Sequence, residues 1–110
     1  MIFGGMPVNA AQLNFTMYIL SKEAAEDLTQ IAEYGDQQFG IEQSDKYRDK
    51  LKSHFLDLAE HPFHCQAVDD IRKGYRRSVC GSHAIYYRIY NETVEIVRVL
   101  GRQDPFAELK

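Results

Sequence analysis

The chain has 110 residues, a formal net charge of −3, and 45% apolar and 26% charged residues, values typical of one globular domain. No apolar run approaches the roughly 20 residues that cross a bilayer, and no basic segment followed by an apolar one indicates a secretory signal. We therefore expect a cytoplasmic protein without a membrane partner. The two cysteines, Cys65 and Cys80, are too few for a disulfide scaffold.

Opposite charges are separated along the chain. Residues 21–61 carry ten acidic and five basic groups, whereas residues 71–103 carry two acidic and seven basic groups. Six of those seven are arginines, whose planar guanidinium groups fit carboxylates and phosphates. This pattern predicts a positive surface for a partner, although any single arginine could instead pair with an acidic helix of its own chain.

The first half predicts a helical hairpin. We interpret residues 1–16 as an N-terminal extension of unknown role and residues 17–110 as a single domain, beginning with a short strand over residues 16–20. Ser21 is a candidate N-cap, and apolar residues at helical spacing follow up to the stop at Gly40: Leu28, Ile31, Ala32, Gly35 and Phe39. A second helix over residues 41–61 carries its own apolar stripe: Tyr47, Leu51, Phe55 and Leu58.

The second half predicts three strands, over residues 71–79, 83–90 and 93–100, because β-branched and aromatic residues dominate there between short turns. The expected order is β-α-α-β-β-β. This is an α+β fold with the helical hairpin packed on one face of a small, mostly antiparallel sheet.

Alternation along residues 84–90 separates the two faces of the sheet. Ile85, Tyr87 and Ile89 are expected to face the helices. The other face is expected to be partly open, with tyrosine and arginine interleaved as on peptide or nucleic-acid surfaces: Ala84, Tyr86, Arg88 and Tyr90. Ordinary cross-strand stacking of Tyr and Arg explains the same pattern equally well.

The order and spacing of several motifs over residues 17–103 resemble the ParE toxins of the ParE/RelE superfamily of bacterial toxin–antitoxin modules. The first motifs are Tyr18-Ile-Leu-Ser21 with Ala24-Ala-Glu-Asp-Leu28, and Phe39-Gly40 with Tyr47. The more specific motifs lie in the second half: Asp70-Ile-Arg72-x-Gly74-Tyr-Arg-Arg77, Gly81-Ser-His83-x-Ile85-Tyr-Tyr-Arg88, and Glu95-Ile-Val-Arg-Val-Leu100.

The resemblance implies a RelE/ParE-like fold and a cytoplasmic toxin that inhibits DNA gyrase. It also implies a cognate antitoxin, similar to ParD or PaaA, that folds on the toxin to give a hetero-oligomer. Such antitoxin tails are usually acidic, which would suit the basic second half. The toxin alone is not expected to bind specific DNA, because the net charge is −3 and no helix carries a basic stripe.

Two segments depart from the family pattern. The last strand is followed by Gly101-Arg102-Gln103-Asp104-Pro105, where members commonly have a Leu-His-x-x-Met-Asp type of sequence, so the target or potency could differ. Residues 1–16 lie outside the resemblance.

The alternative function is a RelE-like, ribosome-dependent mRNA endoribonuclease. That chemistry needs a base, an acid and a cation, for which the candidates are His83, Tyr86 or Tyr87, Arg76, Arg77 and Arg98. Residues 91–110 contain neither the His nor the Tyr that the RelE branch commonly has near its end, so we assign no catalytic residues. We expect no cofactor and no metal, because His61, His64, Cys65, Cys80 and His83 lack the paired spacing of a zinc site.

Two sets of contact residues are therefore predicted. Gyrase contacts are assigned to the basic strands and the C-terminal segment: Arg72, Arg76, Arg77, Arg98, Arg102 and Phe106. Antitoxin contacts are assigned to apolar positions beside that surface: Tyr86, Tyr90, Val97 and Leu56.

Overall fold

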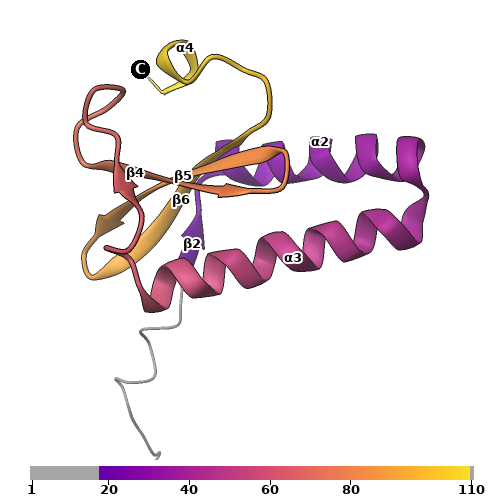
Figure 1. The fold of residues 1–110 in the computed structure, drawn as a ribbon, viewed down its shortest axis with the longest axis horizontal. Coiled ribbons are helices and arrows are strands. Elements are labelled where there is room, and N and C mark those ends of the chain that lie inside the picture. The colour runs from indigo at the N-terminus through magenta and orange to yellow at the C-terminus, as the bar shows by residue number, and fades with distance from the viewer. Residues whose placement is uncertain (1–17, 110) are drawn as a thin grey trace, which may run out of the picture.

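The computed structural model describes residues 18–109, so the predicted N-terminal extension over residues 1–16 lies outside the described residues. Two helices and a sheet make up most of this part (Figure 1). The elements are β2 (Tyr18–Leu20), α2 (Lys22–Phe39), α3 (Ile41–Glu60), β3 (Gln66–Ala67), β4 (Tyr75–Cys80), β5 (His83–Tyr90), β6 (Thr93–Leu100) and α4 (Pro105–Glu108). No helix among residues 18–109 is long and apolar enough to cross a membrane.

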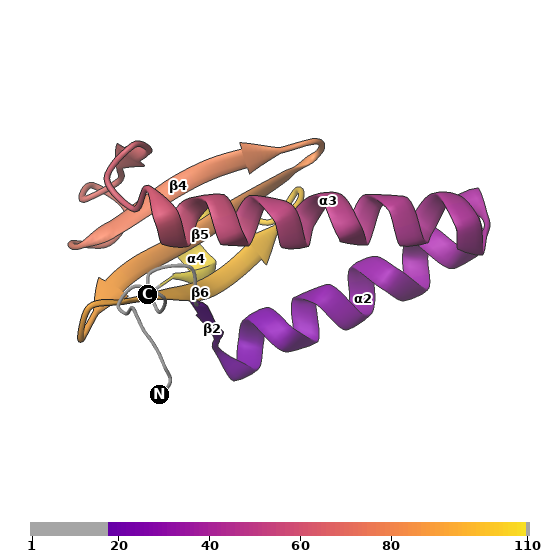
Figure 2. The same cartoon turned by 90° about the horizontal axis from the view of Figure 1, so that it is seen from below.

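The five strands form one sheet in the order β2-β6-β5-β4-β3. β2 runs parallel to β6, and the other neighbouring strands are antiparallel. Helices α2 and α3 lie along the sheet and extend beyond it to their shared turn (Figure 2). The α+β fold with a helical hairpin on a small, mostly antiparallel sheet is therefore confirmed.

Local sequence signals determine the hairpin. The Ser21 side chain accepts a hydrogen bond from the Ala24 N–H and caps α2, as predicted. Gly40 separates the helices with a φ of 85°, in the region that favours glycine. The helices approach closely at Gly35, where an added Cβ would lie 2.7 Å from Ser44 Oγ.

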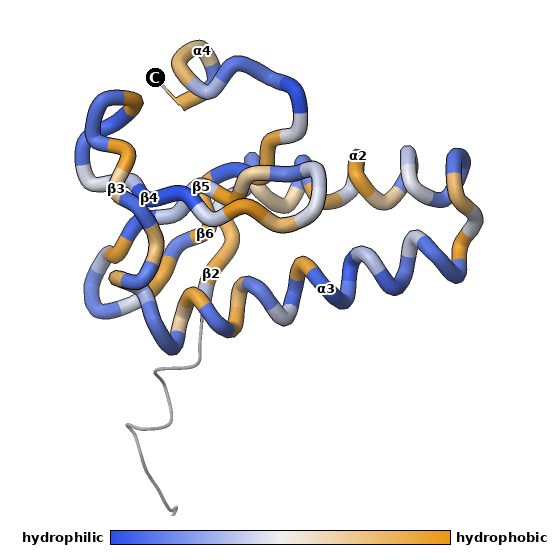
Figure 3. Tube along the Cα trace, viewed as in Figure 1, coloured by the Kyte–Doolittle hydropathy of each residue, from blue (hydrophilic) through white to orange (hydrophobic). Residues whose placement is uncertain are grey.

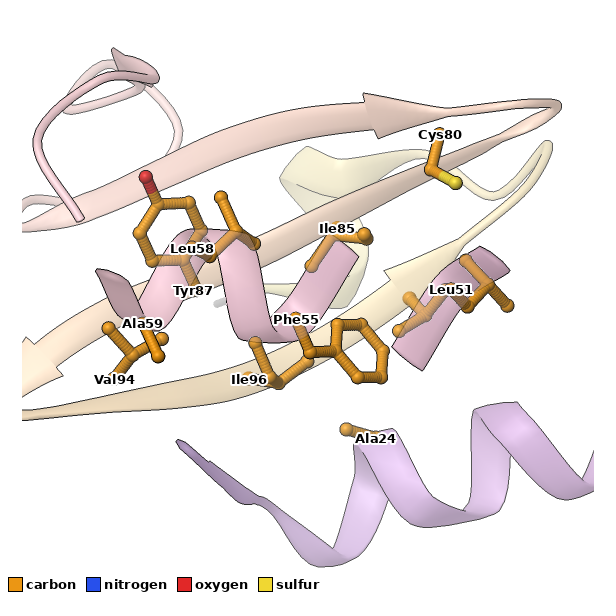
Figure 4. Close-up of a cluster of buried hydrophobic side chains, with 11 residues drawn as sticks. Ala24, Leu51, Phe55, Leu58, Ala59, Cys80, Ile85, Tyr87, Val94 and Ile96 are labelled. Carbon is orange, nitrogen blue, oxygen red and sulfur yellow. The ribbon is translucent and has the colours of Figure 1, made fainter. Parts of the chain in front are cut away.

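The main core lies between the helical hairpin and the sheet (Figure 4). Leu51, Phe55, Ile85, Tyr87 and Ile96 are fully or almost fully buried there. The predicted apolar stripe of α3 is confirmed, because its hydrophobic members all pack in or against this cluster. Phe39 does not share this role, since it is 65% exposed at the far end of the hairpin.

The second sheet face is partly open, as expected, but it is covered where Tyr86 lies. Tyr90 is 55% exposed at one end of this face, whereas Tyr86 is only 3% exposed. A second cluster covers Tyr86, formed with the buried residues Val68, Leu100 and Leu109. Figure 1 shows α4 on the opposite side of the sheet from α3, and Figure 3 shows apolar residues within this C-terminal segment. Tyr86 is buried because the C-terminal segment and the turn before β4 both fold back over this part of the face.

The predicted strand over residues 71–79 begins later, at Tyr75. Residues 69–74 form a turn instead, in which the Gly74 N–H donates to Asp69 Oδ1 at 2.8 Å and Gly74 has a φ of 86°. The prediction also missed β3 and α4, whose two and four residues are too short to show a period.

A β-bulge interrupts the alternation in β6. Tyr86 pairs with Arg98 and Tyr87 with Ile96, so Val97 is the extra residue. Ile96 and Val99 consequently both face the main core. The bulge is held at its outer edge, where Ser21 Oγ donates to the Val97 carbonyl at 2.7 Å.

Candidate functional site

A buried ion pair connects α2, β6 and α4. The carboxylate of Asp27, which is 6% exposed, accepts hydrogen bonds from Arg98 Nε and Nη2 at 2.8 and 2.9 Å. The same carboxylate accepts the Val99 N–H at 2.9 Å, just beyond the bulge. Arg98 Nη1 then donates to Glu108 Oε1 at 2.9 Å. The hydrogen bonds that Arg98 donates to Asp27, more than any other interaction, raise the pKa of Arg98 above its usual range.

Four of the remaining predicted target-binding residues lie around the C-terminal segment or on β4. Arg72 Nη1 donates to the Leu109 carbonyl at 3.0 Å, and Phe106 projects from α4 with 54% of its surface exposed. Arg102 is exposed in the loop before α4. Arg77 pairs across the strands with Tyr86, which places both side chains on the same sheet face. Among residues 18–109, neither Arg77 nor Arg102 forms a side-chain hydrogen bond or an ion pair.

Arg76 lies apart from that group. It pairs with Tyr87, so its side chain emerges on the helical face of the sheet. There Arg76 Nη1 donates to the Cys65 carbonyl at 2.6 Å, and its guanidinium lies 5.1 Å from the centre of the Phe63 ring. The six predicted target-binding residues therefore divide between the two faces of the sheet.

The four predicted antitoxin-binding residues are also divided. Tyr86 and Val97 belong to the second cluster, beneath the C-terminal segment. Tyr90 is 55% exposed at the end of β5, where the Arg88 guanidinium lies 4.9 Å from its ring centre. Leu56 is 46% exposed on α3, in the helical layer.

A cleft of about 820 Å³, which the sequence analysis did not predict, lies between the helical hairpin and the C-terminal end of β6. Residues from α2 and α3 line one side, and the β4–β5 turn with the loop after β6 lines the other: Gln30, Ile31, Tyr34, Gln43, Tyr47, Ser82, His83, Arg102 and Gln103. The cleft thus combines aromatic side chains with amide, imidazole and guanidinium groups, and its volume is typical of ligand and peptide sites.

A hydrogen-bonded pair lies at the base of the cleft. The Tyr47 hydroxyl donates to the Cys80 carbonyl at 3.0 Å and lies 2.7 Å from His83 Nδ1. Burial lowers the pKa of His83, and the nearby Asp27 opposes that effect only in part.

The ribonuclease candidates do not converge on one point. His83 pairs with Cys80 beside the turn, whereas Arg76 pairs with Tyr87 four positions along the strands. At about 3.3 Å per residue, this separation is about 13 Å along the sheet. The Tyr87 hydroxyl donates to the Pro62 carbonyl at 2.8 Å, and burial raises its pKa above the usual range. The described residues thus separate His83 from Arg76 and Tyr87, two of its candidate partners.

One signal in the sequence could have located the ion pair. Asp27 lies on the apolar stripe of α2, between Ala24 and Ile31, where a carboxylate must find a partner. The Tyr47–His83 pair joins residues 36 positions apart, and no local pattern connects them.

The chain thus has a small α+β fold with a helical hairpin on a mostly antiparallel sheet, and a solved structure shares this fold. A solved structure described as "Chromosomal ParDE TA system from P. aeruginosa" superposes with a TM-score of 0.69 at 16% identity, covering 81% of this chain and 99% of that one. At this identity the match shows the fold alone.

Sequence comparison then gives the family. The family described as "ParE toxin of type II toxin-antitoxin system, parDE" matches residues 18–106. Toxin ParE1 of Caulobacter vibrioides is 42% identical over 83 residues, covering 76% of this chain and 85% of that protein. Toxin ParE1 of Mycobacterium tuberculosis is 36% identical over 84 residues, covering 76% and 86%. The chain therefore belongs to the ParE toxin family of type II toxin–antitoxin systems.

Proposed function

We propose that this ParE-family toxin acts in the cytoplasm by binding and inhibiting DNA gyrase, without catalysing a reaction itself. Membership of the ParE family carries this proposal. The separation of His83 from Arg76 and Tyr87 argues only against the catalytic set that joins these three residues, because base, acid and cation must meet at one phosphodiester.

The target surface is proposed around the C-terminal segment. Arg77 and Arg102 have guanidinium groups available to a partner, and Phe106 offers an exposed aromatic side chain. Arginine and aromatic residues commonly provide much of the binding energy of an interface. Arg72 and Arg98 support this surface from below, since both hold the C-terminal segment. Arg76, on the other face, is proposed as a peripheral contact.

The second partner is proposed to be a cognate antitoxin, similar to ParD or PaaA, that forms a hetero-oligomer with the toxin. Tyr90 and Leu56 are accessible for such contacts and Val97 is partly accessible, whereas Tyr86 becomes accessible only when the C-terminal segment moves. The cleft between the hairpin and β6 adds an apolar wall at Ile31 and Tyr34. An amphipathic antitoxin segment would bury these exposed apolar groups.

A supercoiling and DNA-cleavage assay with purified gyrase tests the target, run beside a translation assay that reports mRNA cleavage. We expect inhibited gyrase and intact mRNA. Reversing charge in Arg77→Glu with Arg102→Glu should weaken inhibition at least tenfold. The matched control is Lys52→Glu on the helical layer, which should leave inhibition unchanged.

Arg98→Glu is unsuitable for this purpose, because it would place a second carboxylate against Asp27 and disturb the fold. Unaffected gyrase together with cleaved mRNA would refute the gyrase proposal and support the endoribonuclease alternative. Equal effects of the arginine reversals and of Lys52→Glu would refute the assignment of the surface.

A further inference from the structure

The C-terminal segment, residues 104–109, is held on the sheet by a small number of contacts. Glu108 Oε1 accepts from Arg98 Nη1 at 2.9 Å, and the Leu109 carbonyl accepts from Arg72 Nη1 at 3.0 Å. The Leu109 side chain is 3% exposed and packs in the second cluster. Phe106 and Ala107 are exposed, so Glu108 and Leu109 provide most of the attachment.

The groups that receive these two residues are positioned without them. Asp27 binds Arg98 through Nε and Nη2, on one side of the guanidinium, and leaves Nη1 directed at Glu108. Tyr86 and Leu100 belong to the central strands β5 and β6. A site whose charged group and apolar floor are both fixed in advance binds a ligand with little ordering cost.

The segment itself has little independent stability. α4 has four residues, well below the length at which an isolated helix persists in water. Its Asp104 cap, which accepts from the Phe106 N–H at 3.1 Å, stabilises only one turn. The segment therefore stays in place through its two attached residues and through its covalent link to β6.

From this arrangement we propose that the face formed by Val68, Tyr86, Leu100 and Arg98 is an exchangeable docking site for a partner segment that carries an acidic residue followed by leucine. The chain's own residues 104–109 occupy the site until such a segment displaces them. The identity of the partner rests on the proposed function, because we take it to be the antitoxin. An acidic partner segment would also complement Arg72, whose guanidinium donates to the Leu109 carbonyl at this site.

Displacement has a cost that the structure makes measurable. A segment connected by a short loop competes at an effective concentration of about millimolar. A partner segment must therefore bind more weakly to the full chain than to a chain that ends before the segment. We expect a difference of at least tenfold.

The test uses a chain that ends at Gln103 and a fluorescein-labelled synthetic peptide with the sequence of residues 104–110, followed by fluorescence anisotropy. We expect saturable binding to the shortened chain and at least tenfold weaker binding to the full chain. A control peptide with Glu108→Gln and Leu109→Ala should lose binding, whereas one with Phe106→Ala should keep it. Equal binding of the first control peptide, or equal binding by the two chains, overturns the proposal.

Circular dichroism will establish whether the shortened chain folds. If it does not, the full-length variant Glu108→Gln with Leu109→Ala serves instead, because it loosens the segment without removing it. This folded variant should bind the wild-type peptide at least tenfold more tightly than the unmodified chain does, and absence of that gain overturns the proposal.

The partner is tested separately with the product of the gene neighbouring the toxin gene. Its affinity should rise at least tenfold when the segment is removed. An affinity that does not change overturns the antitoxin as the occupant of this face. Absence of any complex, with peptide binding retained, would instead refute the antitoxin part of the proposed function.

Discussion

Asp27→Asn is the most informative test of the structural reasoning. The substitution keeps the size of the side chain but removes its negative charge. Three N–H groups donate to this carboxylate, those of Arg98 Nε, Arg98 Nη2 and the Val99 backbone. The asparagine amide retains only one acceptor oxygen and presents its own N–H groups to the guanidinium. Arg98, whose side chain is 16% exposed, would then keep a largely buried charge without its main partner.

Removing one member of a buried ion pair typically costs about 3–5 kcal/mol. A domain of this size has a free energy of unfolding of about 5–15 kcal/mol, so Asp27→Asn should remove a large part of it. At about 4–8 °C per kcal/mol, the melting temperature should fall by at least about 12 °C. Circular dichroism measures both quantities, the free energy of unfolding in a urea titration and the melting temperature in a thermal scan.

Glu33→Gln is the matched control, because it removes a carboxylate from an exposed position of the same helix. It should change the free energy of unfolding by less than about 0.5 kcal/mol. A double-mutant cycle with Arg98→Met should give a coupling energy of about 1–3 kcal/mol. A loss below about 1 kcal/mol for Asp27→Asn, or additive effects in the cycle, would refute the role that we assign to the ion pair.

Two further predictions concern the region around Tyr47. Gly81→Ala should destabilise the protein by about 2–5 kcal/mol, because Gly81 has a φ of 60° and its new Cβ would lie 2.7 Å from Tyr47 Oη. Gly74→Ala is its control, because Gly74 has a φ of 86° but an added Cβ would have nothing within 4 Å. It should lower the free energy of unfolding by only about 1–2 kcal/mol in the same urea assay. Equal losses for the two variants would contradict the close contact at Gly81. Because burial lowers the pKa of His83, the folded state binds fewer protons, and this contribution to stability is lost as the pH falls below about 6.5. His83→Gln should therefore reduce the slope of unfolding free energy against pH between about 7 and 5, and identical slopes for wild type and His83→Gln would exclude the effect.

The parts of the fold that were predicted correctly are those with a signal in neighbouring residues. The apolar stripe of α3 and the N-cap at Ser21 can each be recognised from a short segment of sequence, and the structure contains both. The cover over the second face at Tyr86 depends instead on contacts between Leu109 and Tyr86, which are 23 positions apart, and on a four-residue helix. No periodic pattern records such contacts, so alternation alone could not predict that Tyr86 is buried.

The charged residues of the candidate site show the same limit of sequence-based prediction. The sequence predicted an arginine-rich surface, but it could not distinguish arginines that bind a partner from those that bind their own chain. Arg98 is held by two carboxylates, Arg88 by Glu95 at 2.5 Å, and Arg76 by a backbone carbonyl. Each of these acceptors becomes adjacent only after the sheet and helices have assembled.

These pairings change how the basic second half of the chain should be interpreted. An ion-paired arginine contributes little to the field at a distance, because its carboxylate partner cancels its charge. Arg98 and Arg88 are neutralised in this way, whereas Arg72 and Arg76 bind neutral carbonyls and keep their charge. The positive field that reaches a partner therefore comes from Arg77 and Arg102 together with Arg72, Lys73 and Arg76. Arg98 instead acts from below the surface, since it couples the position of α2 to that of the segment that carries Phe106.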